Sequence, residues 1–349
     1  MISTFQNNAE FKSTLEEEFN KIPVSKSSLN SETDCLIIKS ANAWIDQAKS
    51  RPIPKMLLSE LWFENELCIL FSDTNLGKSI FAVQICDSIS RGKSISGFKL
   101  EIKPQKVLYF DFELSDKQFE KRYSNNFTDH YIFNKNFFRA EINPEQLIPD
   151  KFKNFEEFLC DSIEKIVLEQ EVRILVIDNL TYLRNDTEKA KDALLLMKLL
   201  NSLKKKHLLS ILVLAHTPKR DSTKPLSKND LSGSKMLMNF CDSSFAIGES
   251  FQQSGLRYIK QIKQRNTEHI YDSNNIILCR IENKRNFLEF NFQGFDIEYE
   301  HLKVDTQLPN EERTQKVIEF KKNGLSNVDI SKELGISEGT VRNILKKIE

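Results

Sequence analysis

The segment Ser72–Ser79 has the residue types and spacing of a loop that binds a phosphate chain. It fits the pattern G-x-x-x-x-G-K-[ST] at every position except the first, where serine stands for glycine. In such a loop the backbone N–H groups cradle phosphates, the lysine reaches the β and γ phosphates, and the last hydroxyl binds Mg²⁺. We therefore expect Lys78 to be catalytic and Ser79 to hold a metal ion. The nucleotide-binding residues expected are Ser72, Asp73, Thr74, Asn75, Leu76, Gly77, Lys78, Ser79 and Ile80.

Two acidic residues close apolar segments further along the chain. Asp178 ends the segment 173–178, and an aspartate at the carboxyl end of a strand can hold Mg²⁺ through water. Glu113 ends the segment 107–113 and could accept a proton from the water that attacks a γ-phosphate. The alternative for Glu113 is an acid that stabilises a helix N-terminus. Asp111 is expected to face the other side of its strand.

Short apolar strands alternate with longer helices from residue 67 onward. Strands are expected at 67–71, 107–112, 137–142, 174–177 and 210–215, and helices at 79–91, 116–127, 152–170 and 188–205. This alternation predicts an α/β fold with a parallel sheet covered on both faces. Strands at 244–247, 257–263, 275–281 and 287–292 follow without helices between them. They predict an antiparallel extension of the sheet.

The order of these motifs over roughly residues 55–295 resembles the RecA-like P-loop ATPases, especially the plasmid RepA-type and the DnaB-type hexameric helicases. The resemblance implies ATP and Mg²⁺ as cofactors. It matches Glu113 in YFDFELS with the catalytic glutamate and Asp178 in RILVIDNLTYL with the Walker B aspartate. His216 in ILVLAHTPKR matches the residue that senses the γ-phosphate. The alternative for His216 is an ordinary structural histidine.

The resemblance also implies two sets of basic residues. The polar loop 217–233 stands where such motors place a channel loop that contacts single-stranded DNA, and phosphate contacts there would not depend on sequence. Its candidate nucleic-acid ligands are Lys219, Arg220, Lys224 and Lys228. Lys263 and Arg265 resemble finger residues that act in a neighbouring subunit, which implies a homo-oligomer such as a hexamer. The alternatives are a solvated loop and a surface strand.

The last 39 residues, 311–349, predict a small helix-turn-helix domain. Helices are expected at 312–323, 327–334 and 337–347. In a helix-turn-helix the third helix faces the major groove of duplex DNA. The residues expected there are Ser337, Thr340, Arg342 and Asn343. The alternative is a module for protein contacts or oligomer packing.

Four regions are therefore expected. They are an N-terminal arm (1–50) with one helix near residues 11–19, an ATPase domain (51–300), a linker (301–310) and the helix-turn-helix domain (311–349). Lys plus Arg and Asp plus Glu number 50 each, so any binding of a polyanion must be local. The six cysteines show no metal-ligand spacing and are expected to be buried thiols. Because no apolar run is long enough to span a membrane, we expect a cytoplasmic protein without a membrane partner.

Two functions follow from these observations. The first is an ATP-dependent nucleic-acid motor, such as a RepA-like ring helicase or a replication factor of a mobile element. The second is an ATP-controlled DNA-binding regulator or loader without helicase activity. A small-molecule kinase is disfavoured by the late strands and by the absence of a lid-like arginine cluster.

Overall fold

A computed structural model describes residues 36–179, 189–218, 220–231, 234–303, 310–334 and 338–346. The predicted helix near residues 11–19, together with Cys35, Lys219 and Ser337, lies outside these ranges, as does the side chain of Thr340. The chain divides into a unit that ends at Ile53 and a unit that begins at Pro54.

The first unit contains helix α2 (Ala41–Lys49), which the sequence analysis did not predict. The Ser40 side chain caps it by accepting a hydrogen bond from the backbone N–H of Ala43 at 3.2 Å. Such a cap satisfies one of the free N–H groups of the first turn. All of the residues of α2 are exposed within this unit.

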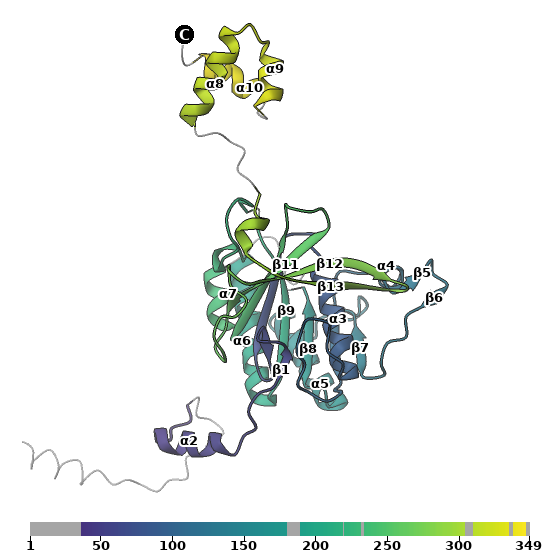
Figure 1. Ribbon diagram of the computed structural model, residues 1–349. Coiled ribbons are helices and arrows are strands. Elements are labelled where there is room, and N and C mark those ends of the chain that lie inside the picture. Colours follow the sequence, from purple (N-terminus) through teal and green to yellow (C-terminus); the bar gives the residue numbers. More distant parts are fainter. Residues whose placement is uncertain are drawn as a thin grey trace, which may run out of the picture. The chain divides into compact units, whose positions relative to one another are not determined.

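The second unit is built on a nine-stranded sheet (Figure 1). The strands, from one edge to the other, are β13 (Phe287–Asp296), β12 (Ile276–Lys284), β11 (Leu256–Lys263), β10 (Ser243–Glu249), β3 (Leu67–Ser72), β9 (Ser210–His216), β8 (Ile174–Asp178), β4 (Val107–Asp111) and β7 (Phe137–Ala140). The six strands β10, β3, β9, β8, β4 and β7 pair in parallel with one another in this order. The pairs β10–β11, β11–β12 and β12–β13 are antiparallel. The predicted α/β fold is therefore confirmed, and it is consistent with a RecA-like P-loop core.

One part of the predicted sheet is wrong. The strand expected at 244–247 was assigned to the antiparallel extension, but β10 runs parallel to β3. The physical reason is helix α7 (Ser234–Phe240), which carries the chain back to the edge where β3 begins. This helix is too short to produce a clear helical period in the sequence, so the crossover was missed.

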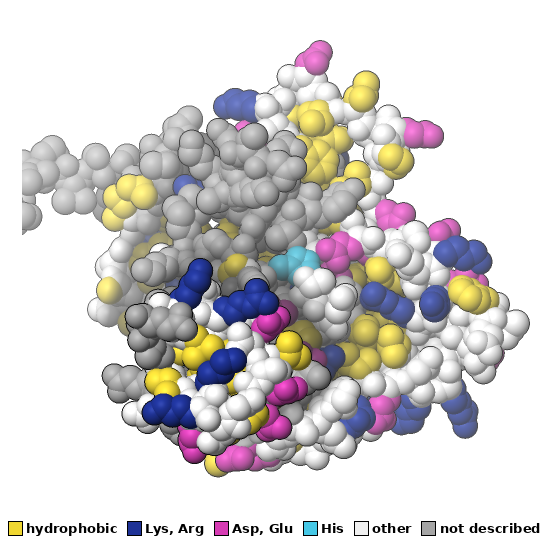
Figure 2. All heavy atoms as spheres, turned by 90° about the horizontal axis from the view of Figure 1, so that it is seen from above, with side chains coloured by type: hydrophobic (Ala, Val, Ile, Leu, Met, Phe, Trp, Pro, Cys, Tyr) yellow, Lys and Arg dark blue, Asp and Glu magenta, His cyan; other side chains and the backbone are white. Residues whose placement is uncertain are grey.

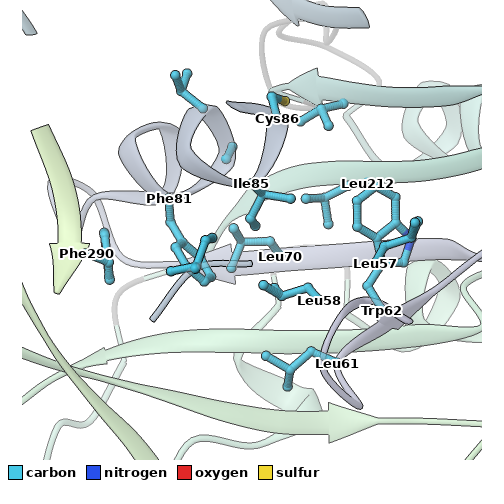
Figure 3. Close-up of a cluster of buried hydrophobic side chains, with 14 of the residues drawn as sticks. Leu57, Leu58, Leu61, Trp62, Leu70, Phe81, Ile85, Cys86, Leu212 and Phe290 are labelled. Carbon is cyan, nitrogen blue, oxygen red and sulfur yellow. The ribbon is translucent and has the colours of Figure 1, made fainter. Parts of the chain in front are cut away.

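Helices cover both faces of the sheet. Because successive strand residues point to opposite faces, Leu67 and Ile69 enter one core while Cys68 and Leu70 enter the other. The first core is closed by α5 (Phe155–Gln170), α6 (Lys189–His207) and α7. The second is closed by α3 (Lys78–Arg91) with the hairpin of β1 (Met56–Leu58) and β2 (Trp62–Phe63). Figure 3 shows α3 and this hairpin meeting over β3.

Two helices are shorter than predicted. Helix α4 covers Asp116–Arg122 instead of continuing to 127, because the following residues form the small hairpin of β5 (Ser124–Asn125) and β6 (Asp129–His130). Helix α5 begins at Phe155, where the Asn154 side chain caps it by accepting from Glu157 N at 2.9 Å. The same unit also contains the short 3₁₀ turns η1 (Lys228–Asp230) and η2 (Glu298–His301).

Three helices follow residue 309: α8 (Asn310–Lys322), α9 (Asn327–Glu333) and α10 (Glu338–Lys346). They share a small core of Val317, Ile330 and Val341. The predicted helices are present, while the joint at 335–337 lies outside the described residues and the helix-turn-helix assignment stays a prediction.

Two simpler expectations can be checked directly. The five described cysteines, at 68, 86, 160, 241 and 279, are buried free thiols as predicted. Among the described helices, none combines the length and the apolar character needed to cross a bilayer.

Candidate active site

The ends of four neighbouring parallel strands bring the predicted site residues to one edge of the sheet. The spatial order is β3, β9, β8, β4, so the chain leaves β3 through α3 and enters β4 on the far side of two other strands. At this edge Ser72 pairs with His216 between β3 and β9, and Asp111 pairs with Asp178 between β4 and β8. A crevice at such a reversal of strand order is where open α/β sheets bind ligands.

The phosphate loop joins β3 to α3 and needs left-handed backbone at two positions. Asn75 has φ 64° and Gly77, the N-cap of α3, has φ 94°. Ser72 has no such requirement: it is the last residue of β3, and its hydroxyl donates to the Asp73 carbonyl at 2.8 Å. Serine can therefore replace the first glycine of the motif without backbone strain.

Lys78 is held inside this loop. Its ammonium donates to the Ser72 carbonyl at 3.1 Å and to the Asp73 carbonyl at 3.2 Å, and it lies 3.1 Å from Nδ1 of His216. Burial lowers the pKa of Lys78 to about 8, although nearby carboxylates, Asp178 first, favour the charged form. An ammonium surrounded by loop carbonyls is placed to exchange these contacts for phosphate oxygens.

Asp178 is buried at the end of β8 with one oxygen available for a metal. Its Oδ2 accepts a hydrogen bond from the Tyr109 hydroxyl at 2.6 Å, whereas its buried Oδ1 has no hydrogen-bond partner. Burial raises the pKa of Asp178 to about 6, and the Ser79 and Tyr109 hydroxyls act in the opposite direction. Mg²⁺ commonly uses one or two protein oxygens and fills the rest of its shell with water and phosphate. The pair Ser79 and Asp178 therefore fits this ion.

Glu113 lies just beyond β4 and is held from two sides. The Asn179 side-chain amide donates to Oε1 of Glu113, and Nε2 of His216 lies 3.5 Å from the same oxygen. The contact with His216 is the main reason that the pKa of Glu113 is lowered. Glu113 is therefore a carboxylate at neutral pH, which is the form that accepts a proton from water.

These side chains surround a cavity of about 210 Å³. Its lining residues are Thr74, Asn75, Gly77, Lys78, Ser79, Ile80, Glu113, Arg122 and His216. The predicted roles of Lys78, Ser79, Glu113 and His216 are thus compatible with a single site. Asp111 does not take part, because it accepts hydrogen bonds from Arg139 and from the backbone N–H of Leu114.

Sequence reasoning missed three residues of this site. Tyr109 lies within a strand, and its contact with Asp178 depends on the register of β4 against β8. Arg122 closes α4 and lines the cavity, and its Nη1 is buried without a hydrogen-bond partner. Asn179 directly follows Asp178 through a cis peptide bond. Its position directly after the predicted Walker B aspartate was the available signal.

Lys263 and Arg265 lie at the other end of the sheet. Lys263 pairs with Ser244, at the end of β10 that adjoins the start of β3. Its ammonium donates to the Cys241 carbonyl at 2.6 Å, and Arg265 forms an ion pair with Asp242 at 3.2 Å. The structure does not bring these two residues to the phosphate loop of their own chain.

The loop after His216 begins at the site and carries the basic residues predicted to bind nucleic acid. Thr217 donates through its hydroxyl to Asp73 and through its backbone N–H to the Ser72 carbonyl at 3.0 Å. Further along the loop, Lys224 and Lys228 are exposed. Arg220 is partly buried and donates to the Lys224 carbonyl at 2.5 Å.

In the C-terminal helices, Arg342 and Asn343 are exposed on α10. Arg342 forms an ion pair with Glu338 one turn earlier, at 2.7 Å. Such an exposed pair within a helix is weak, so it leaves the guanidinium accessible to a phosphate.

Residues 37–222, more than half of the chain, match a protein family model described as "AAA domain". The matched range contains the phosphate loop, Glu113, Asp178 and His216, and it ends before Lys263. It supports an ATPase of the P-loop type. A search of curated proteins found no match.

Proposed function

We propose that this chain, which belongs to the AAA domain family, is a Mg²⁺-dependent ATPase that acts as a nucleic-acid motor, in the manner of a RepA-like ring helicase or replication factor of a mobile element. The observation that carries the proposal is that Lys78, Glu113 and His216 line one cavity. The basic loop that begins at residue 217 directly follows His216. A hydrolytic site next to such a loop is the minimum that a motor on nucleic acid requires.

Each residue of the site has its own role in ATP hydrolysis. The loop backbone and Lys78 bind the β and γ phosphates, and Glu113 takes the proton of the attacking water. Asn179 fixes the carboxylate of Glu113 by hydrogen bonding. Mg²⁺, held by Ser79 and Asp178, would neutralise charge that develops on the phosphates.

His216 supports a link between hydrolysis and the loop. His216 lies between Lys78 and Glu113: its Nδ1 is 3.1 Å from the Lys78 ammonium, and its Nε2 is 3.0 Å from the Asn179 amide nitrogen and 3.5 Å from Oε1 of Glu113. Thr217, the next residue, is hydrogen-bonded to Asp73 and Ser72 of the phosphate loop. A change in the phosphate loop therefore acts directly on the first residues of the basic loop.

The charge distribution restricts any contact with single-stranded nucleic acid to a few local groups. On the face shown in Figure 2, Lys and Arg side chains are interspersed with Asp and Glu, without one dominant basic patch. The net charge of the chain is zero. Binding would therefore depend on particular cations such as Lys224 and Lys228, and would weaken steeply with salt.

The position of the finger candidates supports a homo-oligomer. Lys263 and Arg265 lie at the sheet edge opposite the phosphate loop, so they would reach the site of another subunit rather than their own. A guanidinium added from a neighbour can stabilise the charge of the transferred phosphoryl group. We therefore propose a ring, with a hexamer as the expected form.

A second function is an ATP-controlled DNA-binding regulator or loader without helicase activity. It is favoured by the three helices α8–α10, which have their own small hydrophobic core and exposed Arg342 and Asn343. In this function α10 would bind duplex DNA, and ATP would set assembly. Selective binding to one duplex sequence is its distinguishing property.

Strand separation on a forked duplex distinguishes the two functions. The motor predicts ATP-dependent unwinding by the wild type and loss of unwinding in Lys78→Ala, because that variant loses the phosphate contact. Footprinting on duplex DNA is the parallel measurement. Protection of one sequence together with no unwinding under any nucleotide condition would favour the regulator and exclude the motor.

A further inference from the structure

Tyr109 lies in the middle of β4 and is fully buried in the core that α3 closes. In the parallel register of β4 and β8 it is the partner of Val176, two residues before Asp178. Because successive strand residues alternate between faces, Tyr109 and Asp178 point to the same face of the sheet. The Tyr109 hydroxyl reaches the Asp178 carboxylate from inside the core and donates to its Oδ2 at 2.6 Å.

This contact makes the two oxygens of Asp178 different from each other. Oδ2 is occupied by the tyrosine, since a phenol has a pKa of about 10 and keeps the proton that it donates at neutral pH. Oδ1 is buried and has no hydrogen-bond partner among the described residues. A buried carboxylate oxygen without a donor is costly, whereas a cation or a water bound to a cation would satisfy it. Oδ1 is therefore the oxygen that fits Mg²⁺.

A hydrogen bond on one oxygen also fixes the direction of the other. The carboxylate of an aspartate turns easily about its last side-chain bond, because that torsion is broad. Tyr109 from β4 and Ser79 from α3 both hydrogen-bond Asp178, so the carboxylate is held from two elements. Partners behind a metal-binding side chain fix its orientation, and their loss typically lowers metal affinity about 10–100-fold.

We propose that Tyr109 is a positioning residue for Mg²⁺. By holding Oδ2 of Asp178 from inside the core, it keeps Oδ1 in the orientation that binds the ion or a water of its shell. This inference rests on the proposed Mg²⁺-dependent binding of ATP. Tyr109 does not line the phosphate cavity, so it acts on the metal through Asp178 and makes no contribution of its own to phosphate binding.

Tyr109→Phe tests this role, because it removes the hydroxyl and keeps the ring in the core. The probe is an ATP analogue with an imido group between the β and γ phosphates, which is not hydrolysed. Titration calorimetry of the full chain with this analogue, once with excess Mg²⁺ and once with EDTA, gives two affinities whose ratio measures the contribution of the metal. We expect this ratio to fall about tenfold or more in Tyr109→Phe, while the affinity without metal stays at the wild-type value.

A double substitution shows whether Tyr109 acts through Asp178. Asp178→Asn removes the carboxylate and should itself lower the ratio. If the tyrosine acts only by holding this carboxylate, Tyr109→Phe in the Asp178→Asn background should lower the ratio no further. A further loss as large as in the wild-type background would contradict action through Asp178.

Tyr258→Phe is the matched control for the loss of a buried hydrogen bond. The Tyr258 hydroxyl also donates to a buried carboxylate, that of Glu298, at 3.3 Å. It belongs to β11, which β10 separates from β3 and the phosphate loop. Both variants should unfold at a lower urea concentration than the wild type, whereas only Tyr109→Phe should change the ratio of affinities.

The possible outcomes are distinct. A lowered ratio in Tyr109→Phe alone, with an unchanged affinity without metal, supports the positioning role. An unchanged ratio, an equal fall in Tyr258→Phe, or a weaker affinity without metal overturns that role and leaves the nucleotide site in place. A wild type that binds the analogue equally with and without Mg²⁺ overturns the metal site and the role of Tyr109 together. Failure of the folded wild type to bind the analogue in either condition overturns the nucleotide-binding function as well.

Discussion

At the residue scale, the chemistry depends on how Glu113 is held between neighbours. Asn179 donates to its carboxylate, and His216 beside it lowers its pKa. His216 in turn contacts Lys78. Glu113, His216 and Lys78, the proposed base, sensor and phosphate-binding lysine, thus form one connected group. A change in any of them is expected to affect turnover more than folding.

Glu113→Gln separates binding from catalysis. The amide keeps the size of the side chain but cannot take a proton from water, so turnover should fall by about 100-fold or more. ATP affinity should change little, since Lys78 and the loop backbone remain. Steady-state ATPase rates and titration calorimetry check the two parts, and turnover at the wild-type rate would remove Glu113 from the general-base role.

Residue identities were predictable where a motif fixes their spacing. Lys78 and Ser79 follow from the phosphate-loop pattern, and Asp178 follows from its place at the end of an apolar strand. Tyr109 and Arg122 were not predictable, because their roles depend on strand register and on where α4 ends. Pair contacts between distant segments leave no periodic signal in a single sequence.

At the element scale, the loop 217–231 is anchored at both ends. Its start is bonded to the phosphate loop through Thr217. Near its end, both backbone groups of Leu226 are bound: the N–H donates to Glu298 at 2.7 Å, and the carbonyl accepts from Lys260 at 2.7 Å. Lys260 and Glu298 themselves form a buried ion pair at 2.6 Å, which positions the loop over the sheet.

Glu298→Gln should destabilise this anchor strongly. The substitution keeps the shape but leaves the buried Lys260 ammonium without a counter-ion, a loss that typically costs about 3–5 kcal/mol of unfolding free energy. Urea unfolding checks the value, and protease cleavage within 217–231 should become faster. Asp221→Asn, which removes an exposed pair with Lys224 in the same loop, is the matched control and should change neither. An unchanged urea midpoint in Glu298→Gln would contradict the account of the anchor.

The parallel core could be predicted from the sequence because apolar strands and longer helices alternate regularly there. The position of β10 could not, because α7 is short and the crossover from β9 has little helical period. Helix α2 escaped prediction because it is only nine residues long, and none of its residues is buried. Short elements are defined by their contacts and caps more than by their composition.

At the scale of the whole molecule, the proposed ring requires Arg265 to act on a neighbouring subunit. An Arg265→Ala subunit keeps its own phosphate loop, and a Lys78→Ala subunit keeps its Arg265. Mixtures of the two should therefore recover part of the ATPase activity that each lacks alone. Mixtures of Glu113→Gln with Lys78→Ala should recover none, because both changes inactivate the site of their own chain. The absence of recovery at every Arg265→Ala to Lys78→Ala ratio would contradict action in trans.

The central claim is that the loop 72–79, with Asp178 and Glu113 beside it, binds a magnesium nucleotide. Titration calorimetry of the full chain with ATP, with and without Mg²⁺, tests this claim most directly, with Lys78→Ala as the matched variant. The account predicts saturable binding by the wild type that strengthens with Mg²⁺ and is lost in Lys78→Ala. Well-folded wild-type protein that takes up no ATP in the presence of Mg²⁺, or a Lys78→Ala variant that binds as tightly as the wild type, would contradict it.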